Sequence, residues 1–251
     1  MFTVQERERV HDRILEWADQ DARVVSGAVV GSLAHQPGDR FSDLDLAFGV
    51  RDDCAISDVL EDWSRRLAEE FDAVSLFDLP AGGAIYRVFL LRGCLQVDVS
   101  FAPASTFGAM GPQFRLLFGA AVTRPNPSPP DPRHVFGYGA HHAVRARICI
   151  ERSRPWQAEY WISGVRDQAL TLAAVRLGLA AHYGRGFDGL PDDIRQVALG
   201  ALVRSMDPAN LLQALRRATE LLLSEGALAS VCAPQVAARL SEVLATESGL
   251  S

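Results

Sequence analysis

The first half of the chain alternates short apolar runs with amphipathic stretches. Apolar positions at helical spacing predict helices over residues 4–19 and roughly 55–71. Runs rich in valine, leucine and phenylalanine predict strands at 23–30, 44–50, 73–79, 84–91 and 95–102. This order of elements predicts a small mixed β-sheet flanked by helices.

The pattern changes near residue 134, after which apolar positions recur at helical spacing over long stretches. Five helices are expected, at about 135–151, 156–182, 192–204, 207–224 and 234–246. Between the halves, five prolines occur from Pro125 to Pro132, where neither a helix nor a central strand can persist. We therefore predict an α+β fold in which a sheet domain, 1–124, and an α-helical bundle domain, 134–251, are joined by a proline-rich hinge, 125–133.

Composition narrows the classes of protein that fit this fold. Of the 251 residues 48% are hydrophobic, and the net charge is −6. Through Arg133 the chain has 13 arginines against 20 acidic residues, and beyond it 12 against 11. Because nucleic-acid binding needs a basic footprint, we expect no nucleic-acid partner. We also expect a cytoplasmic protein without membrane contact, since no secretory signal is seen and the apolar runs fall far short of the roughly 20 residues that span a bilayer.

The chain contains no lysine, so all 25 residues counted as lysine plus arginine are arginines. A Walker A loop, a protein kinase and a Schiff-base enzyme each need a lysine at the reacting group. These three kinds of chemistry are therefore excluded, and any cationic contact to phosphate falls to arginine. The four cysteines lie far apart without a C-x-x-C pair, which predicts reduced, packed thiols rather than disulfides or a zinc site.

The segment from Val29 to Phe48 carries the candidate chemistry. Asp43 and Asp45 open a predicted strand and, being two residues apart, project to the same side. Two neighbouring carboxylates repel each other unless a cation lies between them, and a divalent ion with oxygen ligands, Mg²⁺ above all, fits that place. Upstream, the glycine of Gly31-Ser32 lets a phosphate approach the backbone, and a helix beginning at the serine would direct free N–H groups at that anion.

A third carboxylate is expected on a neighbouring strand. Asp98 interrupts an alternating apolar pattern and shares the polar face of its strand with Gln96 and Ser100. If that face is the one that carries Asp43 and Asp45, the three carboxylates would hold two metal ions. Asp98 would then also be placed to accept the proton of an attacking hydroxyl. A solvated strand face is the alternative explanation for each of these aspartates.

The spacing of these residues resembles a known motif. The motif begins with an apolar residue before Gly31-Ser32, followed by ten residues, then Asp-apolar-Asp-apolar and a later isolated aspartate. This pattern is similar to that of the DNA polymerase β-type nucleotidyltransferase superfamily. Within it, GSLAHQPGDRFSDLDL is most similar to the antibiotic nucleotidyltransferases that act on aminoglycosides or lincosamides, in which a helical domain also follows the catalytic one. The resemblance covers about 20 residues plus Asp98.

The resemblance implies a role for each matching residue. Gly31 and Ser32 would contact the nucleotide phosphates, and Mg²⁺ would be bound by Asp43, Asp45 and Asp98. Relatives often have a basic residue shortly after Gly-Ser, whereas this chain has His35 there, and histidine is a weaker phosphate ligand than arginine at neutral pH. We therefore expect the remaining nucleotide contacts to come from the following loop, from Arg40 and Ser42.

The helical half contains one further candidate. Glu159 lies among Trp156, Tyr160 and Trp161, with no cation at helical spacing. A carboxylate ringed by aromatic residues is suited to a polyhydroxylated or cationic substrate, or to a general base. The alternative is an ion pair with one of four arginines of the helical half, Arg145, Arg147, Arg152 or Arg166.

The residues and the resemblance together predict a Mg²⁺-dependent transferase. It would move a nucleoside monophosphate, from ATP or another nucleoside triphosphate, to a hydroxyl of a small molecule such as an aminoglycoside-like antibiotic. Asp98 or Glu159 would accept the proton. Two alternatives stay open, namely an antitoxin-like nucleotidyltransferase that modifies a partner protein and an inactive nucleotide-binding module. The sequence also leaves open the acceptor, the base of the nucleotide and whether the chain acts alone or as a homodimer.

Overall fold

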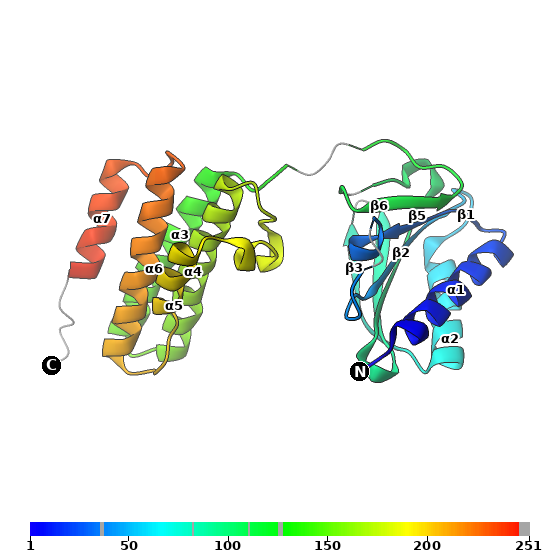
Figure 1. The fold of residues 1–251 in the computed structure, drawn as a ribbon, viewed down its shortest axis with the longest axis horizontal. Helices are drawn as coiled ribbons and strands as arrows, with labels where there is room; N and C mark the ends of the chain where they lie inside the picture. The colour runs from blue at the N-terminus through cyan, green and yellow to red at the C-terminus, as the bar shows by residue number, and fades with distance from the viewer. Residues whose placement is uncertain (36–37, 82, 110, 125–127, 246–251) are drawn as a thin grey trace. The chain divides into compact units, whose positions relative to one another are not determined.

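The chain folds into two compact units, Met1–Pro127 and Ser128–Ser251. The computed structural model describes residues 1–35, 38–81, 83–109, 111–124 and 128–245. Pro125 and Pro127 of the expected hinge lie outside these described residues. Figure 1 shows a sheet with helices in the first unit and a bundle of helices in the second.

The first unit is built on a six-stranded mixed sheet with the strand order β3-β4-β5-β2-β1-β6. The central strands β2 and β5 run parallel, and the other neighbours are antiparallel. The bounds of the strands are β1 Val24–Val30, β2 Leu44–Val50, β3 Val74–Ala81, β4 Ala84–Leu90, β5 Gln96–Pro103 and β6 Phe114–Phe118. The parallel pair therefore lies in the interior of the sheet, with antiparallel strands on both sides of it.

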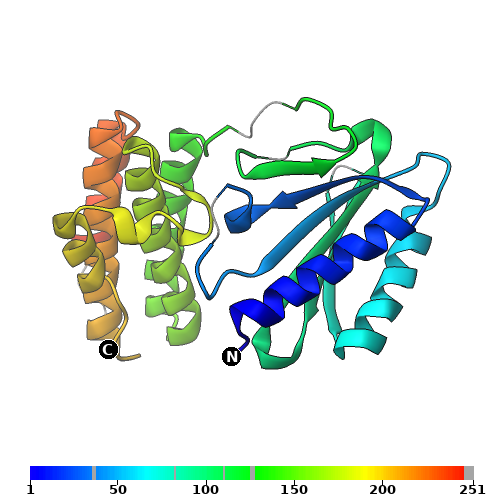
Figure 2. The same cartoon turned by 45° about the vertical axis from the view of Figure 1, so that its right-hand side comes forward.

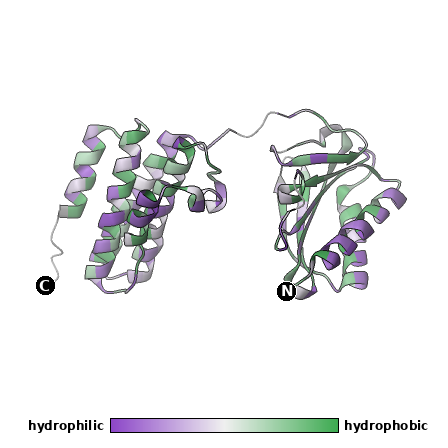
Figure 3. Cartoon of the chain, in the orientation of Figure 1, coloured by the Kyte–Doolittle hydropathy of each residue, from purple (hydrophilic) through white to green (hydrophobic). Residues whose placement is uncertain are grey.

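Two helices, α1 Val4–Gln20 and α2 Ile56–Phe71, cover one face of this sheet (Figure 2). Both are amphipathic, and Figure 3 shows hydrophilic and hydrophobic residues alternating around them. Their apolar sides pack on a core that contains Trp63, Phe48 and Phe101, with ring centres 4.9 to 5.7 Å apart. This aromatic core fixes α2 against the two central strands.

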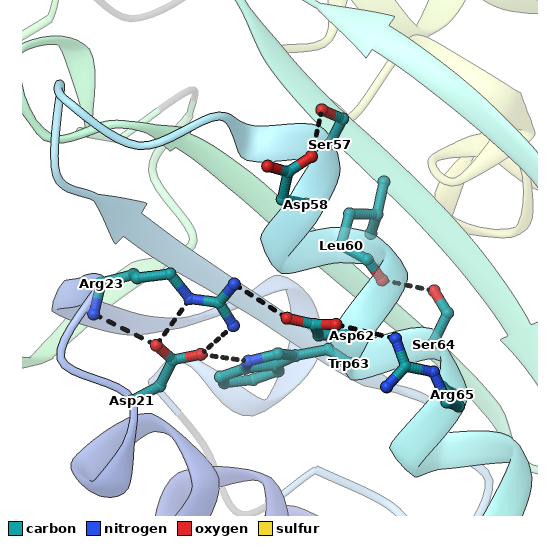
Figure 4. Close-up of polar contacts among 9 residues, drawn as sticks. All are labelled: Asp21, Arg23, Ser57, Asp58, Leu60, Asp62, Trp63, Ser64 and Arg65. Carbon is teal, nitrogen blue, oxygen red and sulfur yellow. Dashed lines mark hydrogen bonds and ion pairs between the residues drawn. The ribbon is translucent and has the colours of Figure 1, made fainter.

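A polar cluster joins the end of α1 to α2 (Figure 4). Asp21 accepts hydrogen bonds from Arg23 Nη2 at 2.8 Å and from Trp63 Nε1 at 2.9 Å. Arg23 Nη1 donates in turn to Asp62 at 2.8 Å. The hydrogen bonds from Arg23, more than that from Trp63, lower the pKa of Asp21 to about 2. The cluster therefore ties the connection between α1 and β1 to α2.

The second unit is a bundle in which α3, α4 and α6 pack against one another. Its helices are α3 Pro132–Glu151, α4 Pro155–Arg176, α5 Asp192–Gly200, α6 Pro208–Leu228 and α7 Pro234–Ala245. Four of them begin with proline, whose fixed φ suits the first helical turn. Asp131 and Asp207 cap α3 and α6 by accepting hydrogen bonds from backbone N–H groups. Among the described residues, no helix combines the length and the apolar character needed to cross a membrane.

A buried ion pair connects two helices of the bundle. Glu225 of α6 is only 2% exposed, and its Oε2 atom lies 2.8 Å from Nη2 of Arg176, the last residue of α4. Burying a carboxylate without a partner carries a large desolvation penalty, and the guanidinium of Arg176 offsets this penalty for Glu225. The pair therefore fixes the end of α4 against α6.

The observed elements confirm the predicted α+β class, a mixed sheet domain followed by a helical bundle. The prediction of a helix beginning at Ser32 is wrong, because the chain forms only a single 3₁₀ turn, Gly31–Leu33, before a loop. The helix predicted to run to residue 182 ends earlier. Gly178 adopts a φ of +69° just beyond Arg176, a typical way for a helix to end. Strand β6 was not predicted.

Candidate active site

Asp45 and Asp98 lie side by side on the two parallel central strands. They are direct partners in the register of β2 and β5. Their neighbours Leu44 and Val97 are fully buried in the core beneath α1 and α2. Because side chains alternate along a strand, both carboxylates are turned to the opposite face of the sheet. The structure thus brings together two of the aspartates that the sequence predicted for neighbouring strands.

Gly31 places the turn after β1 directly against Asp45. Its φ is +68°, in the left-handed region that favours glycine. A Cβ atom added at this position would overlap Oδ2 of Asp45. Glycine is therefore required both by the backbone conformation and by the close approach of the carboxylate. Ser32, the next residue of the turn, is exposed.

Asp98 has an altered affinity for protons. Partial burial is the main cause that raises the pKa of Asp98 above its usual range, and the negative charge of Asp43 adds to the increase. Gln96 opposes both effects, because its Nε2 donates a hydrogen bond of 3.0 Å to Oδ1 of Asp98 and so lowers the pKa. Asp43, the residue before β2, is thus close enough to Asp98 to influence its charge.

The loop that leads to Asp43 contains Arg40 and Ser42, the two residues expected to contact phosphate, and the structure uses them differently. The hydroxyl of Ser42 accepts a hydrogen bond from the backbone N–H of Asp39 at 3.0 Å and donates to the carboxylate of Asp39 at 3.3 Å. Arg40 is exposed, and its guanidinium lies 4.4 Å from the ring centre of Phe41. The hydroxyl of Ser42 is thus engaged within the loop, whereas Arg40 stays accessible to a ligand.

Glu159 belongs to α4 of the second unit and is half-buried. Its Oε1 accepts a hydrogen bond of 2.7 Å from the hydroxyl of Ser163, one helical turn along. Among the described residues no arginine lies within ion-pair distance of Glu159, so the alternative of a structural ion pair is not realised there. Trp156 and Tyr160 are 75% and 67% exposed. The proposed role of Glu159 as a base or substrate contact stays a prediction.

The candidate metal ligands are carboxylates, whose oxygen atoms Mg²⁺ prefers. In the described part of the chain, no group of three or more histidine, cysteine, aspartate and glutamate side chains is gathered closely enough to hold a metal ion. Mg²⁺ usually takes one or two protein carboxylates and completes its shell with water and substrate phosphates. Asp45 beside the Gly31 turn, with Asp43 two residues earlier in the chain, would fit that arrangement better than a closed protein cage. The two-metal set with Asp98 stays a prediction.

Comparison with known proteins identifies no family. No protein-family model matches the chain, and no curated protein does. A solved structure that resembles it is an aminoglycoside 6-adenyltransferase from Bacillus subtilis, with 11% sequence identity and a TM-score of 0.44 over 98% of this chain and 100% of that chain. A likeness this distant does not extend to substrate or chemistry, which have to be argued from the residues themselves.

Proposed function

We propose that the chain transfers a nucleoside monophosphate, AMP from ATP in the first place, to a hydroxyl of a small molecule and releases pyrophosphate. One observation carries this proposal. A glycine turn lies directly against the carboxylate of Asp45, which is paired in register with Asp98. A glycine turn beside paired carboxylates supports metal-assisted phosphoryl transfer, and that chemistry needs no lysine.

Each residue has a distinct part in the proposed reaction. Asp43 and Asp45 hold Mg²⁺, and Gly31 and Ser32 contact the phosphates, with the exposed Ser32 as the polar side chain of the turn. When bound, the metal ion neutralises the charge that develops on the phosphoryl oxygens. Arg40 supplies the cationic contact that lysine supplies in other nucleotide enzymes.

The transfer itself forms one bond and breaks another. The acceptor oxygen bonds to the α-phosphorus while the bond from that phosphorus to the pyrophosphate oxygen breaks. Asp98 accepts the proton of the acceptor hydroxyl, and its raised pKa makes it a stronger base than an ordinary surface aspartate. Glu159 is the second candidate for this role. Pyrophosphate leaves with the electron pair of the broken bond.

Pyrophosphate release tests the proposal directly. Purified protein is incubated with each nucleoside triphosphate and Mg²⁺ across a panel of aminoglycosides, lincosamides and sugars. We expect Mg²⁺-dependent release with at least one acceptor, and we expect Asp45→Asn to abolish it. An exposed carboxylate in the same unit, Asp53, offers a matched control, and Asp53→Asn should retain full activity. The proposal is wrong if a folded protein releases no pyrophosphate with any acceptor, or if Asp45→Asn stays active.

A further inference from the structure

A cavity of about 480 Å³ in the first unit is lined by residues of α1, of the segment after β1 and of β6. Its charged and titratable lining is mostly basic, with Arg7 and His11 from α1, His35 from the segment after β1 and Arg115 from β6. Glu8 is the one acidic side chain in the lining. A basic cavity is unexpected in a half of the chain that has an excess of seven acidic residues. A volume of this size suits a small ligand.

Arg7 is a buried charge without a counter-ion. The residue is 4% exposed, and its Nη1 donates hydrogen bonds to the backbone carbonyls of Asp39 at 2.7 Å and Ser42 at 3.0 Å. Among the described residues, no carboxylate lies within 4 Å of the guanidinium. Buried charges in proteins are normally paired, and carbonyl dipoles compensate a full charge only in part. The remaining positive charge faces a cavity that is lined by this same residue.

Arg115 of β6 is the second arginine in the lining of this cavity. Its Nε donates a hydrogen bond of 2.8 Å to the backbone carbonyl of Ala34, and in the described structure it too forms no ion pair. The hydrogen bonds described for it use Nε alone, which leaves the two terminal amino groups for a ligand. Two guanidinium groups on one cavity match the oxygen atoms of an oxyanion, since each offers a fixed fork of donors.

We propose that this cavity binds a small oxyanion, of phosphate or carboxylate chemistry, between Arg7 and Arg115. The ligand supplies the counter-charge that the buried guanidinium of Arg7 lacks. The cavity lies on the side of Leu44 and Val29, whose side chains face the helices, whereas Asp45 is turned to the other face of the sheet. The cavity is therefore on the other face of the sheet from the carboxylate of Asp45, although Arg7 also bonds to the backbone of Ser42. Binding of an oxyanion there does not depend on the proposed function.

Inorganic phosphate is the probe for this site. Phosphate is titrated into the full chain at constant ionic strength, with EDTA present so that no divalent metal supports binding at the aspartates, and line broadening of its ³¹P signal is recorded. We expect saturable binding at one site. Arg115→Met should weaken it at least tenfold, since a charge-assisted hydrogen bond is lost. Arg115 is exposed, so this variant should fold normally. A parallel titration with acetate distinguishes phosphate from carboxylate ligands.

Matched variants separate a specific site from general charge effects. Arg92→Met removes an equal charge from an exposed arginine of the same unit and should leave phosphate affinity unchanged. Glu8→Gln removes the acidic lining residue and should tighten binding roughly twofold. The proposal is overturned if neither phosphate nor acetate binds saturably. It is equally overturned if Arg115→Met binds like the unaltered protein, or if Arg92→Met loses as much affinity as Arg115→Met.

Discussion

Replacing Gly31 with alanine tests the contact on which the candidate site is built. The added methyl group would occupy the space of Oδ2 of Asp45. The carboxylate would have to move by about 1 Å to regain van der Waals distance, and a displacement of that size at a reacting centre can lower the rate about 100-fold. The left-handed backbone adds a destabilisation of about 1 kcal/mol, since alanine tolerates a φ of +68° less well than glycine.

Two control glycines separate the contact from the backbone effect. Gly178 has a φ of +69° and Gly83 has a φ of +87°, and an added Cβ atom would meet no other atom within 4 Å at either position. Gly83 lies in the same unit as Gly31. Their alanine variants should lose about 1 kcal/mol of stability as well, because the backbone strain is similar.

The assay combines urea unfolding with Mg²⁺-dependent pyrophosphate release. We expect all three variants to unfold at similarly lowered urea concentrations, and we expect only Gly31→Ala to lose activity, by about 100-fold. Binding of a non-hydrolysable ATP analogue provides a readout that needs no acceptor, and it should weaken in the same variant alone. Full activity of Gly31→Ala, or an equal loss in Gly83→Ala, would refute the reasoning.

Three further predictions concern the polar cluster around Asp21, the buried ion pair of the bundle and the proposed base. The pKa of Asp21 is about 2 in the folded chain against an ordinary 3.8, so its carboxylate stabilises the fold above about pH 4, and this stabilisation is lost as the pH falls towards 2. The loss should be about 1 to 2 kcal/mol after allowance for solvent screening, and urea unfolding of Asp21→Asn should show a correspondingly flatter pH dependence between pH 5 and 2. Arg176→Met leaves Glu225 buried without its partner and should lower the free energy of unfolding by about 3 kcal/mol. The double variant with Glu225→Leu should recover much of this stability. Equal stability of Arg176→Met and the unaltered protein in urea unfolding would contradict the pairing. Asp98→Asn should lower turnover at least 100-fold and leave the urea midpoint nearly unchanged, and retained turnover would assign the base to another residue.

The central strands could be predicted closely, because their signal is local. β2 is a compact apolar run, and β5 alternates apolar and polar residues, so the sequence displays both patterns directly. These patterns predicted β2 at its observed bounds and placed Asp98 on the face opposite Val97. The pairing of Asp45 with Asp98 then depended only on β2 and β5 being neighbours, as they are.

The remaining features depend on contacts between distant positions. The close approach of Gly31 to Asp45 and the bond from Arg7 to Ser42 arise only when α1, the turn and β2 are packed together. No local pattern marks Arg7 as buried, since it lies in a strongly charged stretch of α1. Strand β6 pairs with β1 and is short, and five residues carry little periodic signal.

The fate of the α- and γ-phosphoryl groups of ATP tests the central claim most directly. Parallel reactions with ATP labelled with ³²P at the α- or the γ-phosphorus are run with Mg²⁺ and the acceptor panel, and with cell lysate as a source of protein acceptors. The account predicts that the α-label moves to a small-molecule acceptor while the γ-label appears in pyrophosphate, and that both transfers vanish in Asp45→Asn. A labelled protein band would move the acceptor to a partner protein. Transfer of the γ-label to the acceptor, or no transfer of either label by folded protein, would contradict the account.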